Sequence, residues 1–367
     1  MKINFYEHNI KKLNTNSVLN SLYLTSGPIC KKVEKKIAKR FKKKHCLLTN
    51  SWTNAVIGIL KSLDLKKNDE VIVPSLTFVA CANVVELSGA KVVFADVDPK
   101  TLLLSIDDCL KKITSKTKVI MPVHLYGNLF DTKKLKDKIR KKIKIIEDCA
   151  HTFYGKYSNN QIVGHYADFS VFSFYATKNI TCGEGGAIIT NNKNIHLIKS
   201  ILINGMTASA HNRFTGNKYN SWDVKKPGFK GNLSDINASL LLNQIPKENS
   251  NALKRKKIYG YFKKKLENNV DIPSSTNFKK RDYHLFPIGL KNKVQRDKLL
   301  KELFLKKIPA TVNYTAITKL DFYKKKYKCK CPVSENWGER TLSLPFHLNL
   351  NKKKINFICK IILNFLS

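Results

Sequence analysis

The sequence predicts an α/β protein with a mostly parallel sheet, followed by a smaller C-terminal α/β domain. From 69 to 147, short apolar segments alternate with amphipathic ones, which is the pattern of parallel strands joined by helices. Between 169 and 190, two more apolar segments flank a glycine-rich turn. After about 270 the rhythm changes. We therefore predict a large domain over 1–245, with an N-terminal arm over 1–25, and a small domain over 246–367.

The individual elements follow from apolar runs and helical periodicity. Val33, Ile37 and Phe41 recur every four residues, so 28–44 is expected to form a helix with a narrow apolar stripe. The segment 46–60 combines a strand, a polar turn and a helix that Ser51 or Thr53 can cap. Further strands are expected at 70–73, 91–96, 118–123, 143–146, 169–174, 187–190, 284–290 and 309–314. Further helices are expected at 77–88, 105–112, 132–141, 236–268 with a break near Pro246, 294–306 and 352–366.

Two stretches lack such periodicity. The segment 204–235 contains many Asn, Gly and aromatic residues, and an irregular stretch of that length is usually a functional loop or a disordered one. The segment 322–332 is basic and rich in tyrosine, and a loop is expected there as well.

The composition indicates a globular protein without a membrane span or a disulfide framework. Of 367 residues 43% are hydrophobic, which suffices for one large or two moderate domains. The sequence shows no apolar run long enough to cross a bilayer and no secretory leader. The nine cysteines are scattered, and the close pair Cys329 and Cys331 lacks the second pair or histidine that a metal site needs. We therefore expect a cytoplasmic protein.

The charge is unusual. The chain has 67 Lys and Arg residues against 27 Asp and Glu residues, a formal charge of +40. Such an excess suggests a nucleic-acid or anionic-surface partner. The basic residues, however, are spread over nearly every predicted helix and form no single arm. This distribution is typical of a lysine-rich, solvated surface. We favour the solvated surface, whose field would also attract phosphorylated substrates.

The setting of Lys178 suggests chemistry. This lysine lies between the apolar strand 169–174 and a turn that contains Gly183, Gly185 and Gly186. Apolar surroundings disfavour the ammonium form and lower the pKa of an amine, which makes it a nucleophile able to form a Schiff base. An ordinary loop lysine is the alternative in so basic a chain.

Two more positions lie where a parallel sheet binds ligands. The helix that starts near Thr53 has amides and a positive dipole end that suit a phosphate, although a plain N-cap has the same pattern. Asp148 follows an apolar strand, at the carboxyl end where such sheets bind ligands. A helix cap, a metal ligand and a partner for a cationic ring are all compatible with Asp148, and nothing local decides among them.

Nine motifs occur in order over nearly the whole chain: T-N-S-W-T-N at 49–54, D-E-V-I-V-P-S-L-T-F at 69–78, F-A-D-V-D at 94–98, M-P-V-H-L-Y-G at 121–127, I-E-D-C-A-H at 146–151, F-S-F-Y-A-T-K-N-I at 172–180, G-E-G-G at 183–186, G-F-K-G-N-L-S-D at 228–235 and S-L-P-F-H at 343–347. Together they resemble the DegT/StrS-type nucleotide-sugar aminotransferases, pyridoxal phosphate (PLP) enzymes of fold type I. The resemblance implies a three-layer αβα PLP-dependent transferase large domain with a smaller C-terminal domain.

For the cofactor ring the resemblance implies four contacts. Lys178 would hold PLP as a Schiff base and, once displaced, would move the substrate proton as general base and acid. Asp148 would pair with the pyridine nitrogen and keep it protonated, so that the ring accepts electrons. Phe78 would stack on the ring, and His151 would lie near its phenolic oxygen.

For the cofactor phosphate it implies the backbone amides near Thr53 and Asn54 together with the hydroxyl of Ser173. Asn232, on the long loop, would reach the phosphate of the other subunit's cofactor. A homodimer with shared active sites is therefore expected.

The implied reaction moves an amino group, through pyridoxamine phosphate, from an amino acid to a nucleotide-linked keto-sugar, with L-glutamate as the expected donor. The amino sugar would serve surface polysaccharide synthesis, such as that of lipopolysaccharide O-antigen. Sugar dehydratases of the family lack the Schiff-base lysine, so Lys178 favours transamination. Tyr314 and His347 are candidate substrate contacts, although 313–318 lacks the histidines usual in the family.

Two alternatives remain beside the aminotransferase. The first is a catalytically idle or regulatory protein of the same fold whose basic surface binds nucleic acid. The second, a dinucleotide-binding dehydrogenase, fits poorly because G-E-G-G lies between two strands and not between a strand and a helix. No metal is expected.

Overall fold

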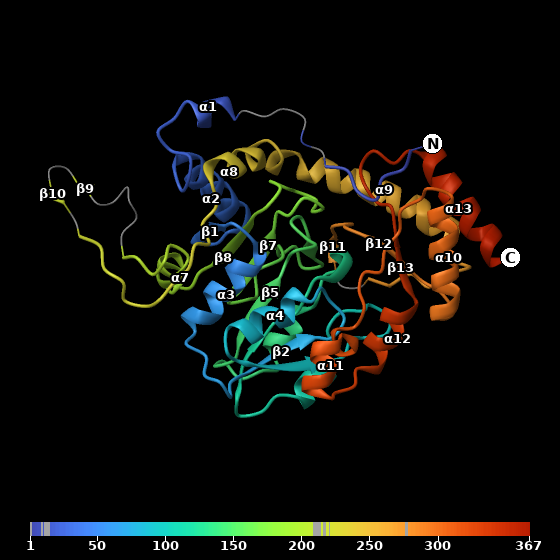
Figure 1. Cartoon of the computed structure of the whole chain (residues 1–367), viewed down its shortest axis with the longest axis horizontal. Helices are drawn as coiled ribbons and strands as arrows, with labels where there is room; N and C mark the ends of the chain where they lie inside the picture. Colours follow the sequence, from blue (N-terminus) through green and yellow to red (C-terminus); the bar gives the residue numbers. More distant parts are fainter. Residues whose placement is uncertain are drawn as a thin grey trace.

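A seven-stranded sheet forms the centre of the computed structural model, which describes residues 2–8, 10, 15–207, 214–215, 218–219, 221–275 and 278–367 (Figure 1). In spatial order the strands are β1 (His45–Thr49), β8 (Gly186–Thr190), β7 (Phe169–Ser173), β5 (Lys144–Asp148), β4 (Thr117–Ile120), β2 (Glu70–Pro74) and β3 (Lys91–Ala95). Only β8 runs antiparallel to its neighbours. The predicted mostly parallel α/β fold is confirmed.

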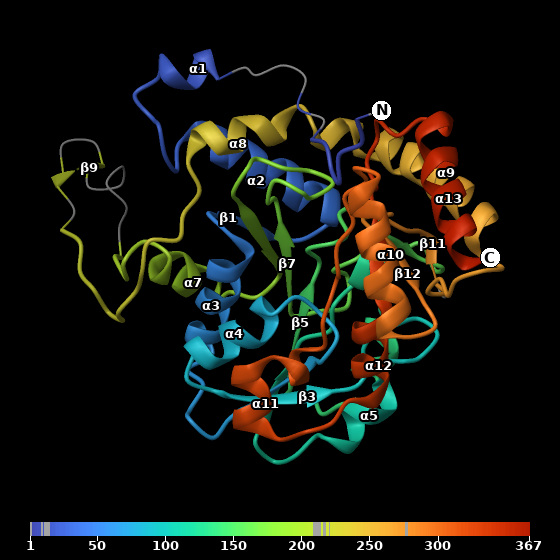
Figure 2. The ribbon, with the colours of Figure 1, turned by 45° about the vertical axis from the view of Figure 1, so that its right-hand side comes forward.

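Helices cover both faces of this sheet. Because successive strand residues point to opposite faces, Val171 and Ile188 join an apolar cluster with α3 (Trp52–Ser62), whereas Phe172 and Ile189 join another with α2 (Pro28–Phe41). The helices α4 (Ala80–Leu87) and α7 (Ile195–Ile201) contact α3, and α8 (Asp235–Leu242) contacts α2, as Figure 2 shows. The connections also contain α5 (Ile106–Lys111), η1 (Leu125–Gly127) and α6 (Thr132–Lys136).

A third apolar cluster belongs to the C-terminal part of the chain. There α9 (Glu248–Leu266), α10 (Lys293–Leu305) and α13 (Lys352–Leu366) surround an antiparallel pair, β12 (Phe286–Gly289) and β13 (Thr341–Leu344). Ile3 joins this cluster, and the Phe346 N–H donates to the Phe5 carbonyl. The start of the N-terminal arm therefore packs on the C-terminal part. The domain boundary at 245/246 stays a prediction.

Most predicted elements are present, and the differences concentrate in the C-terminal part. The segment 322–332, expected to be a loop, is mostly α11 (Asp321–Tyr327), followed by α12 (Pro332–Arg340). The rings of Tyr323 and Tyr327 both pack edge-on against the ring of Phe94, with ring centroids 5.6 Å apart. These tertiary contacts stabilise a helix that the basic composition of the segment did not indicate. The predicted strand 309–314 is wrong, since only a single bridge joins Thr311 to Ser343. The strand that pairs with β12 is β13, which was not predicted.

Two other boundaries are informative. The predicted helix 236–268 consists of α8, the 3₁₀ turn η3 (Ile245–Lys247) and α9, so the break near Pro246 is confirmed. The helix expected at 77–88 starts at Ala80, which leaves Phe78 in the preceding turn. Residues 208–213, 216–217 and 220 of the long segment 204–235 lie outside the described residues. The remaining elements are α1 (Asn16–Leu19), β6 (Lys156–Tyr157), β9 (Phe214–Thr215), β10 (Lys218–Tyr219), β11 (Phe278–Lys280) and η4 (Ile317–Lys319).

Among the described residues, no helix combines the length and the apolar composition that a bilayer crossing requires.

Candidate active site

The carboxyl ends of β5 and β7 border a cavity of about 450 Å³. Asn313 and Tyr314 of the C-terminal part close it from the other side. It is lined by most of the residues that the sequence singled out, namely Thr53, Phe78, Asp148, His151, Ser173, Lys178 and Tyr314. Asn54, Asn232 and His347 are not among its lining residues. Its position at the strand ends is where a parallel sheet binds its ligand.

Lys178 stands in the turn that follows β7. Its backbone N–H donates to the Tyr175 carbonyl at 2.9 Å, which fixes the turn. Burial lowers the pKa of the Lys178 amine to about 8, an effect that the negative field of Asp148 partly opposes. A substantial fraction of this amine is therefore neutral, and nucleophilic, near physiological pH.

Asp148 ends β5 and is almost completely buried, with 5% of its surface exposed. One carboxylate oxygen, Oδ1, accepts the Ala150 N–H at 2.8 Å, and Oδ2 accepts the Cys81 thiol at 3.3 Å. Burial raises the pKa of this carboxyl, whereas both hydrogen bonds and the Lys178 charge lower it. A cationic ring nitrogen placed in the cavity would further favour the carboxylate.

His151 can be assigned one tautomer. Its Nδ1 accepts the backbone N–H of Tyr126 at 3.1 Å, so the hydrogen of the neutral ring must be on Nε2. Burial, with the positive charge of Lys178, lowers the pKa of His151 and keeps the ring neutral. Nε2 lies 3.3 Å from the Tyr314 hydroxyl. His151 therefore offers an N–H donor to the cavity, as a phenolate oxygen would require.

The N-terminus of α3 supplies an anion seat. The Ser51 hydroxyl caps this helix by accepting the Asn54 N–H at 3.0 Å. The N–H groups of Trp52 and Thr53 have no protein acceptor within the described ranges, and the helix dipole adds positive potential there. The amides that remain for a phosphate are thus those of residues 52 and 53, while the Asn54 amide is engaged in the cap.

Close strand packing brings Ser173 to the same seat. Ser173 ends β7 and pairs with Gly186 at the start of β8. A Cβ at Gly186 would lie 2.8 Å from the Trp52 nitrogen, so only glycine lets β8 approach the start of α3 this closely. The Ser173 hydroxyl and the α3 amides consequently line one end of the cavity.

Phe78 presents an aromatic face to the cavity. Its side chain is 56% exposed, and its ring centroid lies 5.8 Å from that of Tyr314. An exposed large apolar ring at a cavity wall suits the stacking of a planar aromatic ligand.

The model of the DegT/DnrJ/EryC1/StrS aminotransferase family matches residues 7–363. The chain is 30% identical over 355 residues to GDP-perosamine synthase of Escherichia coli O157:H7, covering 96% of this chain and 94% of the relative. Its fold resembles that of PseC from Helicobacter pylori, an aminotransferase involved in pseudoaminic acid biosynthesis, with a TM-score of 0.90 and 26% identity, covering 100% of this chain and 99% of PseC.

The chain belongs to the DegT/DnrJ/EryC1/StrS aminotransferase family. It is a PLP-dependent aminotransferase. Spr1654 of Streptococcus pneumoniae, solved in a PLP form and a PMP form, is similar in fold, and its PMP form gives a TM-score of 0.88 at 27% identity, covering 96% of this chain and 95% of that one. The cavity suits this cofactor, because a carboxylate, a depressed-pKa amine and a helix N-terminus with free amides line it together. The family membership favours the enzyme over the nucleic-acid-binding alternative.

Asn232 and His347 lie outside the cavity of this aminotransferase chain. The Asn232 amide donates to the hydroxyls of Thr25 and Ser26, at 2.9 and 2.8 Å, and lines a separate pocket of about 60 Å³. His347 is buried, with Nδ1 3.8 Å from the Glu7 carboxylate. The predicted role of Asn232 in a second subunit, and that of His347 toward substrate, stay predictions.

The aminotransferase cavity also contains residues that sequence reasoning did not select, chiefly Cys81, Tyr175 and Glu184. Cys81 follows Phe78 by three residues at the start of α4, and this spacing could have identified it. Glu184 stands between the glycines of the G-E-G-G turn. Tyr175 carries no sequence signal beyond its nearness to Lys178.

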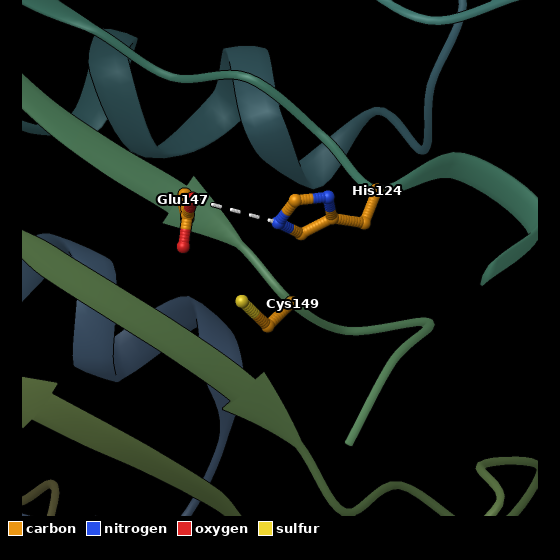
Figure 3. A group of neighbouring side chains, drawn as sticks. All are labelled: His124, Glu147 and Cys149. Carbon is orange, nitrogen blue, oxygen red and sulfur yellow. Dashed lines mark ion pairs between the residues drawn. The ribbon is translucent and has the colours of Figure 1, made fainter. Parts of the chain in front are cut away.

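Three buried side chains, His124, Glu147 and Cys149, lie close together (Figure 3), and the last two flank Asp148 in the chain. Their potential ligand atoms lie within 4.8 Å of one another, which resembles a metal site. However, His124 Nδ1 accepts the Phe130 N–H at 3.0 Å, so the hydrogen of the neutral imidazole is on Nε2, 3.8 Å from Glu147. Binding a cation through Nε2 would require either an imidazolate or a change of tautomer that breaks the hydrogen bond from Phe130. The trio is better described as a buried donor facing a carboxylate.

Proposed function

We propose that this enzyme transfers an amino group from L-glutamate to a keto-sugar carried on a nucleotide. The observation that carries the proposal is that Lys178 and Asp148 line the same cavity. Asp148 ends β5, and Lys178 follows the neighbouring strand β7. Relatives named for sugar amination, GDP-perosamine synthase and PseC, support a sugar acceptor.

Lys178 is the proposed catalytic residue. Bound PLP supplies an electron sink for the pair left behind when a substrate Cα proton departs. The Lys178 amine, with its pKa near 8, can take that proton at Nζ and return it to another carbon with little energetic penalty in either direction. Lys178 is partly buried, which limits the access of bulk water to the same proton.

Three side chains are proposed to hold the cofactor ring. Asp148 would face the ring nitrogen and stabilise its protonated form, while Phe78 would stack on the ring. His151 would donate its Nε2 hydrogen to the phenolic oxygen. The seat made by the amides near Thr53 and the Ser173 hydroxyl holds the phosphate, with Asn54 contributing the hydrogen-bonded cap beneath it.

The far wall is proposed to bind the sugar. Tyr314 and Asn313 are neutral polar groups there, which suit sugar hydroxyls, while Tyr175 and Glu184 add a hydroxyl and a carboxylate from the large-domain side of the cavity. The nucleotide would extend from the opening of the cavity, and the net positive charge of the chain, +40, favours its phosphates.

We further propose a homodimer in which Asn232 serves the partner's cofactor phosphate. Two apolar side chains just before Thr25, which the Asn232 amide contacts, are strongly exposed in the single chain: Leu22 at 96% and Leu24 at 50%. Leu24 accepts the Asp235 N–H, which places it close to the Asn232 segment. Exposed apolar groups of this kind favour a partner surface. Light scattering on the purified protein tests the stoichiometry.

The proposed setting is the cytoplasm, where nucleotide sugars and glutamate are available, and the proposed purpose is an amino sugar for a surface glycan such as O-antigen. The test is incubation of the purified enzyme with L-glutamate and a panel of nucleotide keto-sugars, with mass spectrometry of the products. A mass increase of about 1 Da, from the exchange of a carbonyl oxygen for an amino group and a hydrogen, identifies the substrate. Failure with every nucleotide sugar, combined with turnover of a simple keto acid, would redirect the proposal to another acceptor.

A further inference from the structure

Residues 281–285, here termed the connector, join the two parts of the chain. On one side lies β11, which pairs with β6 next to the His151 loop. On the other side lies β12 of the C-terminal sheet. The connector is therefore a second covalent link, besides the η3 turn between α8 and α9, through which the position of the C-terminal part reaches the active site.

Asp282 of the connector anchors the loop that follows His151. Its side chain is completely buried. A single oxygen, Oδ2, accepts the Thr152 hydroxyl at 2.7 Å and the backbone N–H groups of Phe153, Tyr154 and Gly155 at 2.6, 2.5 and 3.2 Å. Four donors on one carboxylate oxygen fix the backbone direction of 152–155, and hence that of the residue before it.

His284 contacts both His151 and the turn that contains Lys178. Its ring lies against the ring of His151, with centroids 4.3 Å apart and planes at 35°. Its Nδ1 lies 3.2 Å from the side-chain oxygen of Asn179, the neighbour of Lys178. Arg255 of α9 donates to the Asn179 carbonyl at 3.1 Å. Two contacts therefore position the turn of Lys178 through Asn179: one from Arg255 of α9 and one from His284 of the connector.

The connector lies on the turn at Tyr126 and Gly127. The His284 N–H donates to the Tyr126 carbonyl at 3.3 Å. Gly127 has φ +88°, and a Cβ there would lie 1.7 Å from the Asp282 carbonyl oxygen. Any side chain at 127 would displace the connector. The same turn supplies the N–H that fixes the His151 tautomer, so the two contacts are coupled.

We propose that Asp282 and His284 are positioning residues for the transamination, which set the ring of His151 and the turn of Lys178 against the cofactor. The inference depends on the proposed function only for the identity of the substrate. The use of the cofactor follows from the family membership and does not depend on that proposal. Burial, and after it the positive charge of Lys178, lowers the pKa of both His151 and His284, so both rings are neutral.

The test uses His284→Phe, which keeps a ring against His151 and loses the contact to Asn179. We expect a roughly tenfold lower kcat, the size of one buried hydrogen bond, with KM values for both substrates within about twofold. We also expect the pH midpoint of the visible absorbance of bound cofactor to shift, because Lys178 and His151 reorient. The melting temperature should stay within a few degrees of the wild-type value. His196→Phe, an exposed histidine away from the cavity, is the matched control.

Asp282→Asn gives an independent arm. The amide oxygen can still accept at the Oδ2 position, and its nitrogen replaces Oδ1, which has no hydrogen-bond partner in the described part of the chain. We expect a smaller absorbance shift than for Asp282→Leu, which removes the acceptor. A wild-type kcat and pH midpoint in His284→Phe, or losses that merely follow the melting temperature, would overturn the inference. Because the absorbance measurement needs no sugar, it decides the inference even if the proposed substrate is wrong.

Discussion

The two walls of the cavity differ in how the chain builds them. On the large-domain wall, each key group lies at or just beyond the end of a parallel strand: Asp148 ends β5, Ser173 ends β7 and Lys178 follows β7. On the opposite wall, Asn313 and Tyr314 come from an irregular segment held by distant contacts, such as that of the Tyr126 hydroxyl with the Asn313 carbonyl. Sheet topology alone brings the first wall together, whereas the second depends on packing between remote segments. We therefore assign the chemistry to the first wall and substrate choice to the second.

The largest expected effect tests the first wall at its centre. Lys178→Ala removes the attachment point and the proton carrier together, so turnover should fall by roughly 10²–10⁴-fold or more, with loss of the bound-cofactor absorbance. Steady-state kinetics and the visible spectrum measure both. Lys360→Ala on α13 is the control that should change neither. Retained turnover in Lys178→Ala would move the chemistry to another residue.

Asp148→Asn tests the same wall without a change of shape. The amide cannot stabilise a protonated ring nitrogen, so kcat should fall by roughly 10²–10³-fold while the melting temperature changes little. Asp137→Asn, on the exposed end of α6, serves as the control. Equal kcat in variant and wild type would show that another group faces the ring nitrogen.

The pH dependence of cofactor loading sharpens the electrostatic side of the comparison. Only the neutral Lys178 amine attacks the aldehyde, and its pKa is about 8. The loading rate of the cofactor-free protein should therefore rise about tenfold per pH unit below 8 and level off above it. In Asp148→Asn the plateau should begin at lower pH, because the negative field that raises the lysine pKa is gone. A rate still rising steeply at pH 10 would contradict the depressed pKa.

The smallest effect is expected on the second wall. Tyr314→Phe removes the hydroxyl near His151 Nε2, which is equivalent to one hydrogen bond, so kcat/KM for the sugar should fall about two- to tenfold. The half-reaction with glutamate, followed by the cofactor spectrum, should change less. If Tyr314→Phe were as damaging as Asp148→Asn, the division of labour between the walls would be incorrect.

The first wall could be predicted from sequence because its signals are local. A strand followed by Asp148, or by a lysine and a glycine turn, carries its own positional meaning once the sheet is parallel. The cap at Ser51 was likewise among the predicted options, and the structure shows it in place. Cys81 was not predicted because its contact with Asp148 joins α4 to the end of β5, and these two elements lie far apart in the chain.

The second wall was harder because its order comes from tertiary contacts. The helix α11 is basic in sequence, and its stability rests on two tyrosines that pack against Phe94 of β3. The pairing of β12 with β13 joins segments separated by α10 and α12, which no local pattern encodes. The connector contacts of Asp282 and His284 are of the same kind. Sequence reasoning thus fails where a residue's meaning depends on a distant partner.

The packing of residues 2–8 on the C-terminal part has a consequence for biosynthesis. Ile3 enters the cluster built by α9, α10 and α13, and Glu7 accepts the Asn349 amide at 2.6 Å. During translation this segment is made before every element that it contacts. It must therefore stay unpaired until the end of the chain is synthesised. The C-terminal core is consequently completed late, and its timing is set by the rate of translation and not by formation of the central sheet.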